Sequence, residues 1–260
     1  MREPFEVILS NYTMRIKSKM INYNSMNEEK SKQFFSASAK VKKDCLKKPA
    51  PFVDKTELKY FNFNLPTGIK FEYIYGIDLK NAYASILLKD GYISKETYFY
   101  LSTKLTKLDR LGALGMLAGK KKHIFFDEQG KEIEDKTETK VKETENYFFH
   151  AVQRTGEIME QLHALIGNDF LFTWVDCIYF RSEKNLTICA EFLRDNDFMF
   201  HEKKYTKFST ELTKTGDTLR VIMFEVKEDG KEVFKIFHAP TKKKKIINDL
   251  SILLDKFAKK

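Results

Sequence analysis

Two aspartates, Asp78 and Asp176, each stand inside an apolar run of the chain. Asp78 follows residues 71–77, whose aromatic and β-branched side chains predict a buried strand. Asp176 has apolar residues on both sides over 172–180. A carboxylate in the middle of an apolar strand costs several kcal/mol unless it is paired or binds a metal ion. If the fold brings the two aspartates together, they would hold two magnesium ions, which prefer oxygen ligands.

Composition predicts a folded protein with a polyanionic partner. The 260 residues can form one large domain or two small ones, and the 14% aromatic content argues against disorder. The net charge of +9 favours nucleic acid, although an AT-rich coding bias gives the same lysine excess. The three cysteines form no C-x-x-C pair and the five histidines are scattered, so neither a zinc site nor a disulfide framework is predicted.

The N-terminus has no secretory pattern, and no apolar run approaches the length of about 18 residues typical of a membrane helix. We therefore expect a soluble protein of a reducing compartment, with no membrane partner.

The pattern of elements predicts an α+β fold, with an antiparallel sheet that carries helices on one face. Residues 40–51 are basic and contain proline, which indicates a surface arm or linker, and residues 120–145 indicate a charged hairpin or loop. Strands are expected at residues 71–77, on both sides of a junction at Asp176 and Cys177, and in a hairpin over 219–237. Helices are expected at residues 82–88, 94–117, 147–166, 186–193 and 242–260.

Residues 77–86 read Ile-Asp-Leu-Lys-Asn-Ala-Tyr-Ala-Ser-Ile, which resembles motif A of family B DNA polymerases, D-x-x-S-L-Y-P-S-I. Asp78 falls on the metal ligand of that motif, and Tyr83 falls on its tyrosine. The segment around Asp176 resembles motif C, D-T-D-S-I-Y, with Asp176 on the second aspartate. Trp174 stands where motif C has its first aspartate.

Two further segments follow the family order. Residues 107–115 are similar to motif B, K-x-x-x-N-S-x-Y-G, because Lys107 and Gly115 have the right separation, but the asparagine, serine and tyrosine are replaced. Lys203 and Tyr205 match the K-x-Y element of the protein-primed phage branch. The resemblance covers about half of the chain, and no D-x-E of a proofreading exonuclease precedes motif A.

This resemblance implies a minimal polymerase palm that adds deoxynucleotides to a primer 3′-hydroxyl. It implies a basic arm at residues 1–65, a palm with a minimal fingers helix at 66–200, and a thumb-like region at 201–260. Partners would be a DNA primer-template, dNTPs and further protein subunits, in the cytoplasm of a bacterial or phage-infected cell.

The resemblance also assigns residues to roles. Two magnesium ions, with manganese as an alternative, would be held by Asp78, Leu79 and Asp176. The incoming nucleotide would contact Tyr83, Lys107 and Gly115. Primer and duplex would contact Lys203, Tyr205, Lys242, Lys243, Lys244 and Lys245.

Alternatives remain open at this point. Asp78 could cap the following helix, Asp176 could be an ordinary turn residue, and Tyr83 could be a core aromatic. The lysines could belong to solvated surfaces. The whole chain could be an inactive palm-fold subunit that binds nucleic acid, or an untemplated nucleotidyl transferase.

Overall fold

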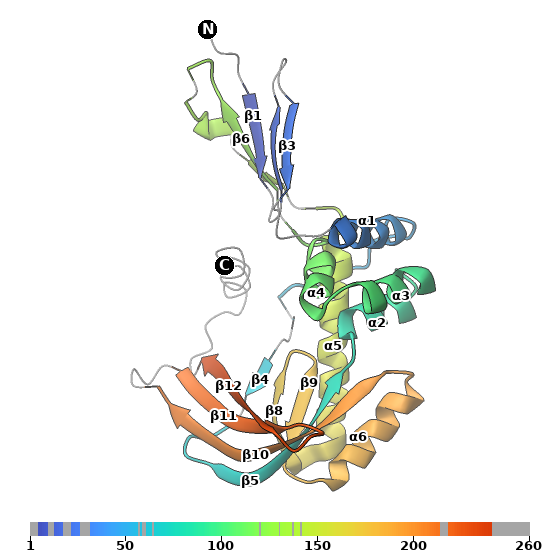
Figure 1. Cartoon of the computed structure of the whole chain (residues 1–260), viewed down its shortest axis with the longest axis vertical. Helices are drawn as coiled ribbons and strands as arrows, with labels where there is room; N and C mark the ends of the chain where they lie inside the picture. Colours follow the sequence, from blue (N-terminus) through green and yellow to red (C-terminus); the bar gives the residue numbers. More distant parts are fainter. Residues whose placement is uncertain are drawn as a thin grey trace. The chain divides into compact units, whose positions relative to one another are not determined.

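The computed structural model describes residues 5–9, 13–17, 22–26, 32–56, 58, 61–63, 65–119, 121–129, 131–136, 138–140, 142–213 and 218–240. The chain divides into two compact units, of which the first contains Met1–Val53 and Ile86–Ala151 and the second contains Asp54–Ser85 and Val152–Lys260. The chain passes between the units at three positions. Two of them fall within helices, α2 (Ala82–Lys89) and α5 (Glu145–Ile166), which are labelled in Figure 1, and the third lies between Val53 and Asp54, outside any helix or strand.

The first unit combines an antiparallel five-stranded sheet with helices. The strand order is β3-β2-β1-β6-β7, and the charged hairpin predicted at 120–145 is confirmed by the pairing of β6 with β7. Its strands are β1 (Phe5–Leu9), β2 (Thr13–Lys17), β3 (Asn22–Met26), β6 (Lys121–Phe126) and β7 (Glu138–Lys140). Its helices, besides parts of α2 and α5, are α1 (Lys32–Cys45), α3 (Lys95–Lys104), α4 (Lys107–Gly115) and the short η1 (Glu134–Lys136).

The prediction of a basic arm in residues 1–65 is wrong for the described part of that segment. β1 pairs with both β2 and β6, and α1 extends through Cys45, into the segment predicted as a linker. Phe34, Ala37, Val41 and Cys45 are fully buried. Their spacing of three or four residues places them on one helix face, which explains why a lysine-rich sequence is helical and packed here.

Asp44 fixes the end of α1 to the beginning of α3. Its carboxylate accepts hydrogen bonds from the Ser94 backbone nitrogen at 3.0 Å, Ser94 Oγ at 2.8 Å, Thr97 Oγ1 at 2.6 Å and Lys47 Nζ at 2.5 Å. Burial alone would raise the pKa of Asp44, but these hydrogen bonds outweigh it and lower the pKa well below its usual value.

The single helix predicted at 94–117 is two helices. Ser94 caps α3, but Leu105 has extended φ and ψ angles of −121° and 145°. Thr106 then begins α4 by accepting a hydrogen bond from the Asp109 backbone nitrogen at 3.2 Å. In an uninterrupted helix the Asp109 amide would donate to a backbone carbonyl one turn earlier. Here it donates to the Thr106 hydroxyl instead, and this cap favours the start of a new helix.

The second unit is a seven-stranded antiparallel sheet in the order β12-β11-β10-β5-β9-β8-β4. The predicted strand at 71–77, the helices at 147–166 and 186–193, and the hairpin at 219–237 all correspond to observed elements. The strands are β4 (Phe61–Phe63), β5 (Lys70–Leu79), β8 (Phe170–Trp174), β9 (Cys177–Phe180), β10 (Phe200–Leu212), β11 (Thr218–Val226) and β12 (Glu232–Pro240). The remaining helices are η2 (Gly167–Asp169) and α6 (Lys184–Asp195).

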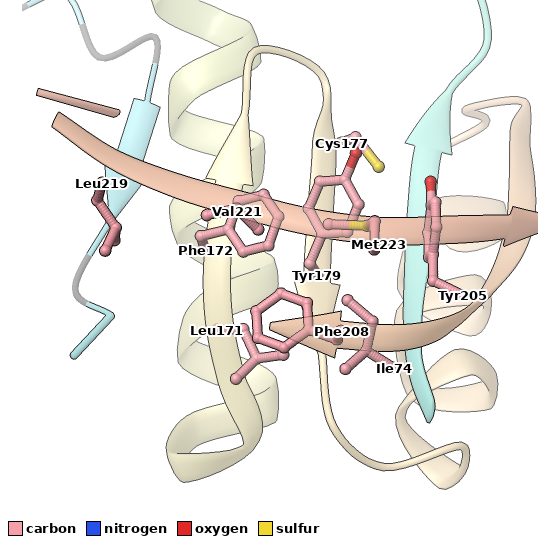
Figure 2. Packing of buried hydrophobic residues seen from close by; sticks show 10 residues of the cluster. All are labelled: Ile74, Leu171, Phe172, Cys177, Tyr179, Tyr205, Phe208, Leu219, Val221 and Met223. Atoms are coloured by element: carbon pink, nitrogen blue, oxygen red, sulfur yellow. The ribbon is translucent and has the colours of Figure 1, made fainter. Parts of the chain in front are cut away.

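Helices cover one face of this sheet, and the other face closes on itself. The second part of α5 and α6 lie behind the strands in Figures 1 and 2. On the opposite face, Phe237 of β12 reaches Trp174 of β8 with ring centroids 4.9 Å apart, and it also contacts Phe172 and Tyr179 at 5.8 Å. The sheet is therefore strongly curled, and the α+β fold class with helices on one face is confirmed.

The apolar cluster inside the curled sheet is drawn in Figure 2. Phe172 and Tyr179 stack with centroids 4.1 Å apart at its centre. Its members are Ile74, Leu171, Phe172, Cys177, Tyr179, Tyr205, Phe208, Leu219, Val221 and Met223. Contributions from β5, β8, β9, β10 and β11 make the strands one structural unit.

The predicted division at residue 200 is not observed. β10 pairs with β5 from Phe200 opposite Leu79 to Ser209 opposite Lys70, so the residues assigned to a thumb complete the sheet that carries Asp78. Sequence spacing suggested a separate region because it does not reveal which strand lies beside β5. The helix predicted at 242–260 lies outside the described residues.

We predict that Asp44→Asn lowers the free energy of unfolding at neutral pH by about 1–3 kcal/mol, because four donors from three neighbouring residues lose a charged acceptor. The folded-state pKa of Asp44 is lowered, so its stabilisation is present above the unfolded pKa of about 3.9 and is lost as pH falls through the folded value. Urea unfolding from pH 7 to pH 2 measures this difference.

The matched control is Glu96→Gln, which also removes one negative charge from the first unit but at a side chain that is 84% exposed. Its effect should stay within about 0.5 kcal/mol. A loss of equal size in both variants would show that net charge, rather than the Asp44 hydrogen bonds, sets the stability.

Candidate active site

Asp78 and Asp176 come together at one end of the second sheet. In the strand ladder Asp78 of β5 lies opposite Cys177 of β9, the residue that follows Asp176. The Leu79 backbone nitrogen donates a hydrogen bond to the Asp176 carbonyl oxygen at 2.9 Å. Asp78 on β5 and Asp176, directly before the neighbouring strand β9, are thus held side by side by backbone pairing, independently of their side chains.

The turn that carries Asp176 is strained. Trp174 pairs with Cys177, so Val175 and Asp176 are the two central residues of a tight hairpin, one position earlier than predicted. Val175 has a φ of 56°, in the left-handed region that a β-branched side chain strongly disfavours. Strain of this kind persists where the surrounding structure imposes it, and it is concentrated at functional sites.

Lys203 provides the counter-charge for Asp78. Its Nζ donates a hydrogen bond to Asp78 Oδ2, and the two side chains are 23% and 12% exposed. Lys203 lies directly opposite Gly76 on β5, and because Gly76 has no side chain, the lysine can lie diagonally toward Asp78. Burial alone would lower the pKa of Lys203, but the nearby acids, Asp78 and Glu225 among them, outweigh it and raise the pKa.

Glu225 of β11 extends this charged cluster. It is 7% exposed, and its carboxylate accepts from Lys227 Nζ at 2.5 Å and contacts Lys235 Nζ at 3.2 Å. Burial alone would raise the pKa of Glu225, but these two lysines, with Lys203, lower it. Carboxylates and ammonium groups therefore alternate from Asp78 through Lys203 to Glu225 and its lysines.

Two buried tyrosines form the floor beneath the charged cluster. Tyr179 and Tyr205 are 3% and 2% exposed, and their rings lie 5.4 Å apart. The Tyr179 hydroxyl lies beside the Cys177 side chain in Figure 2. A Cβ on Gly76 would come within 3.3 Å of the Tyr205 ring and 3.2 Å of the Ile178 carbonyl oxygen, so a larger residue here would force its neighbours to shift by a few tenths of an ångström.

This burial corrects the role predicted for Tyr205. A side chain with 2% exposure inside the apolar cluster packs in the core and is not available to hold a primer. Residues two positions apart in a strand point to the same face, so Lys203 and Tyr205 both face inward. The lysine lies at the open end and the tyrosine lies deeper. Lys203 instead contacts Asp78, and this lysine rather than Tyr205 belongs to the site.

The donor set fits a divalent cation. The carboxylates of Asp78 and of the turn residue Asp176 are hard oxygen ligands, and the Lys203 ammonium already occupies a cation position on Asp78. Across the described ranges, no group of three or more His, Cys, Asp or Glu side chains is arranged to hold a metal ion. A two-carboxylate site is nevertheless typical of magnesium, which completes its coordination with water and substrate phosphates.

The other predicted residues are placed as follows. Tyr83 is half-buried in the first turn of α2, and the side chain of Leu79 is buried next to Asp78. Lys107 and Gly115 are the first and last residues of α4, which belongs to the first unit; Lys107 is exposed. Their contact with a nucleotide remains a prediction. Lys242, Lys243, Lys244 and Lys245 lie outside the described residues.

Sequence reasoning missed Glu225, Gly76 and Val175. Glu225 could have been found, because it is an acid inside the apolar run 221–226 and so meets the criterion applied to Asp176. Gly76 carries a weaker signal as a lone glycine in a strand. Val175 carries none, since valine is the residue least expected at a positive φ.

No protein-family model and no curated protein matches this chain. The family B resemblance therefore rests on the motifs. Among the described helices, none has the length and apolar character needed to cross a membrane.

We predict that Val175→Gly raises the free energy of unfolding of the metal-free protein by about 0.5–1 kcal/mol. Relief of left-handed strain, roughly 1–2 kcal/mol, exceeds the backbone entropy that glycine costs, roughly 0.5–1 kcal/mol. Thermal and urea unfolding measure the change. The matched control, Val233→Gly in β12, lies at a strand position without positive φ and should destabilise. Destabilisation by both variants would contradict the assignment of strain to Val175.

Proposed function

We propose that the protein is a minimal family B-like DNA polymerase that adds deoxynucleotides to a primer 3′-hydroxyl by two-metal catalysis. The observation that carries the proposal is the backbone-held adjacency of Asp78 on β5 and Asp176 in the β8–β9 turn, with the Lys203 ammonium bound to Asp78. The order of motifs A, B and C around these two residues supports the same reaction class.

In this proposal Asp78 and Asp176, with the backbone at Leu79, hold two magnesium ions. The bound ions would lower the pKa of the primer 3′-hydroxyl and stabilise the pyrophosphate leaving group. The protein's own contribution is position: β5 and the β8–β9 turn fix both carboxylates before substrate arrives, so little reorganisation is needed during reaction.

The resemblance to motifs A and B assigns Tyr83, Lys107 and Gly115 to the incoming nucleotide. Tyr83 lies in the first turn of α2, five residues after Asp78, and in this proposal its ring would stand against the ribose 2′ position. Lys107 would neutralise phosphate charge, and Gly115 would allow close approach of the nascent base pair. The lysines at 242–245 would contact duplex phosphates. Such an enzyme would act with partner subunits in the cytoplasm of a bacterial or phage-infected cell.

The first functional prediction is that Asp78→Asn and Asp176→Asn each reduce primer extension by at least about 10³-fold, because each removes a ligand charge from the metal pair. Extension of a labelled primer with magnesium, with and without template, measures this. Glu202→Gln is the matched control, since Glu202 is an exposed acid on β10, next to Lys203, and should retain activity. Extension that proceeds without a template would favour an untemplated transferase, and absence of any extension by the wild-type protein would favour an inactive binding subunit.

The second functional prediction concerns sugar choice. Tyr83→Ala should raise the use of ribonucleotides relative to deoxynucleotides by about tenfold or more, because removal of the ring opens space for a 2′-hydroxyl. Competition between rNTP and dNTP in single-nucleotide extension gives the ratio. Tyr83→Phe keeps the ring and should keep the wild-type ratio. An unchanged ratio in Tyr83→Ala would identify Tyr83 as a packing residue.

A further inference from the structure

Lys203 and a divalent ion compete for the same atom. The Lys203 ammonium is bound to Asp78 Oδ2, and Asp78 is the carboxylate that the proposed function assigns to the metal. A divalent ion that approached Asp78 with the lysine in place would meet a positive charge at hydrogen-bonding distance. In a site where both side chains are largely buried, this repulsion is screened much less than at a surface.

Without a cation, however, Asp78 would be costly. Asp78 stands at the buried end of β5 and is only 9% exposed, so little water can solvate its carboxylate. Leaving a buried carboxylate unpaired is strongly destabilising, whereas pairing it with a hydrogen-bonded ammonium offsets much of the desolvation. In the metal-free protein Lys203 therefore compensates the negative charge of Asp78, as a metal ion would in the metal-loaded protein.

Glu225 provides a second acid near the lysine. Its charge acts on Lys203, and it is itself buried and fixed by Lys227 and Lys235. If Lys203 leaves Asp78, its ammonium remains within the field of Glu225. The lysine thus has two acidic neighbours, and only one of them is needed for the metal.

From this geometry we infer that Lys203 is a built-in counter-cation, which occupies the metal position on Asp78 in the metal-free protein and is displaced when a divalent ion binds. The inference rests on the metal-holding role of Asp78 in the proposed function. It makes metal binding and the Lys203–Asp78 ion pair mutually exclusive, so each weakens the other by the same factor.

The test is a titration of the full-length protein with Mn²⁺, followed by electron paramagnetic resonance, in the absence of nucleic acid and nucleotide. Lys203→Gln keeps a hydrogen-bond donor beside Asp78 but removes the charge. It should bind Mn²⁺ about 5- to 150-fold more tightly than wild type, the usual range of coupling between two sites. Its thermal midpoint should be lower than wild type without metal and should rise more on addition of Mg²⁺.

Lys204→Gln is the matched control. Lys204 is the next residue on β10, its ammonium lies 4.6 Å from the centroid of the Tyr73 ring, and the pleat directs it to the opposite face. The Lys204→Gln variant changes the net charge by the same amount as Lys203→Gln and should bind Mn²⁺ as wild type does. Lys203→Arg has the opposite expectation, because a guanidinium pairs with a carboxylate in two places and should weaken Mn²⁺ binding.

Three outcomes overturn the inference. Equal or weaker Mn²⁺ binding by Lys203→Gln contradicts it while leaving the proposed function in place. If Lys203→Gln does not fold, the Mn²⁺ affinity of Lys203→Arg decides. A Lys203→Arg variant that binds Mn²⁺ as tightly as wild type, or more tightly, contradicts the inference. Failure of wild type and Lys203→Gln alike to bind Mn²⁺ removes both the inference and the metal-based proposal. Correct metal competition without any primer extension would remove the polymerase assignment alone.

Discussion

The second unit depends on the position of β5 between β9 and β10. A strand paired on both sides has every backbone group satisfied, and its inward side chains face those of both neighbours. Here that arrangement places Asp78 opposite Cys177 on one side and opposite His201 on the other. The turn aspartate and Lys203 are brought to Asp78 by this pairing, and the tyrosine floor is built by the same register two and four residues deeper.

The site combines a rigid apolar base with a compensated charge cluster. Three carboxylates, those of Asp78, Asp176 and Glu225, lie in the same unit as the ammonium groups of Lys203, Lys227 and Lys235. Buried charges of this kind seldom add stability compared with apolar packing, because desolvation offsets their attraction. Their presence next to a strained turn at Val175 is therefore better explained by function than by folding.

The curled sheet limits how the protein can use this site. The face that carries Asp78 is filled by aromatic side chains from β8, β9, β10 and β12 in its deeper part. The end of the sheet near Asp78, Asp176 and Lys203 carries charged side chains. Substrate for the proposed reaction must approach at this end, which is consistent with the partial exposure of Asp176 and Lys203 and with the burial of Tyr205.

The sequence by itself determined the local elements and the two acids that needed partners. Alternating or continuous apolar runs predicted β5, β9 and the β11–β12 hairpin, and helical spacing predicted α5 and α6, because these patterns depend only on neighbours in the chain. The same physical rule, the cost of an acid in an apolar strand, identified Asp78 and Asp176. It would also have identified Glu225.

Tertiary structure alone decided that β10 lies beside β5, that residues after 200 complete the same sheet, and that Lys203 rather than Tyr205 reaches the site. It also decided that Val175 takes a strained φ, and that the lysine-rich α1 is packed through a face of Phe34, Ala37, Val41 and Cys45. The pairing of β10 with β5, and with it the position of Lys203, joins residues more than a hundred positions apart in the chain. Pairing at that separation is set by the packing of the whole sheet rather than by any local pattern.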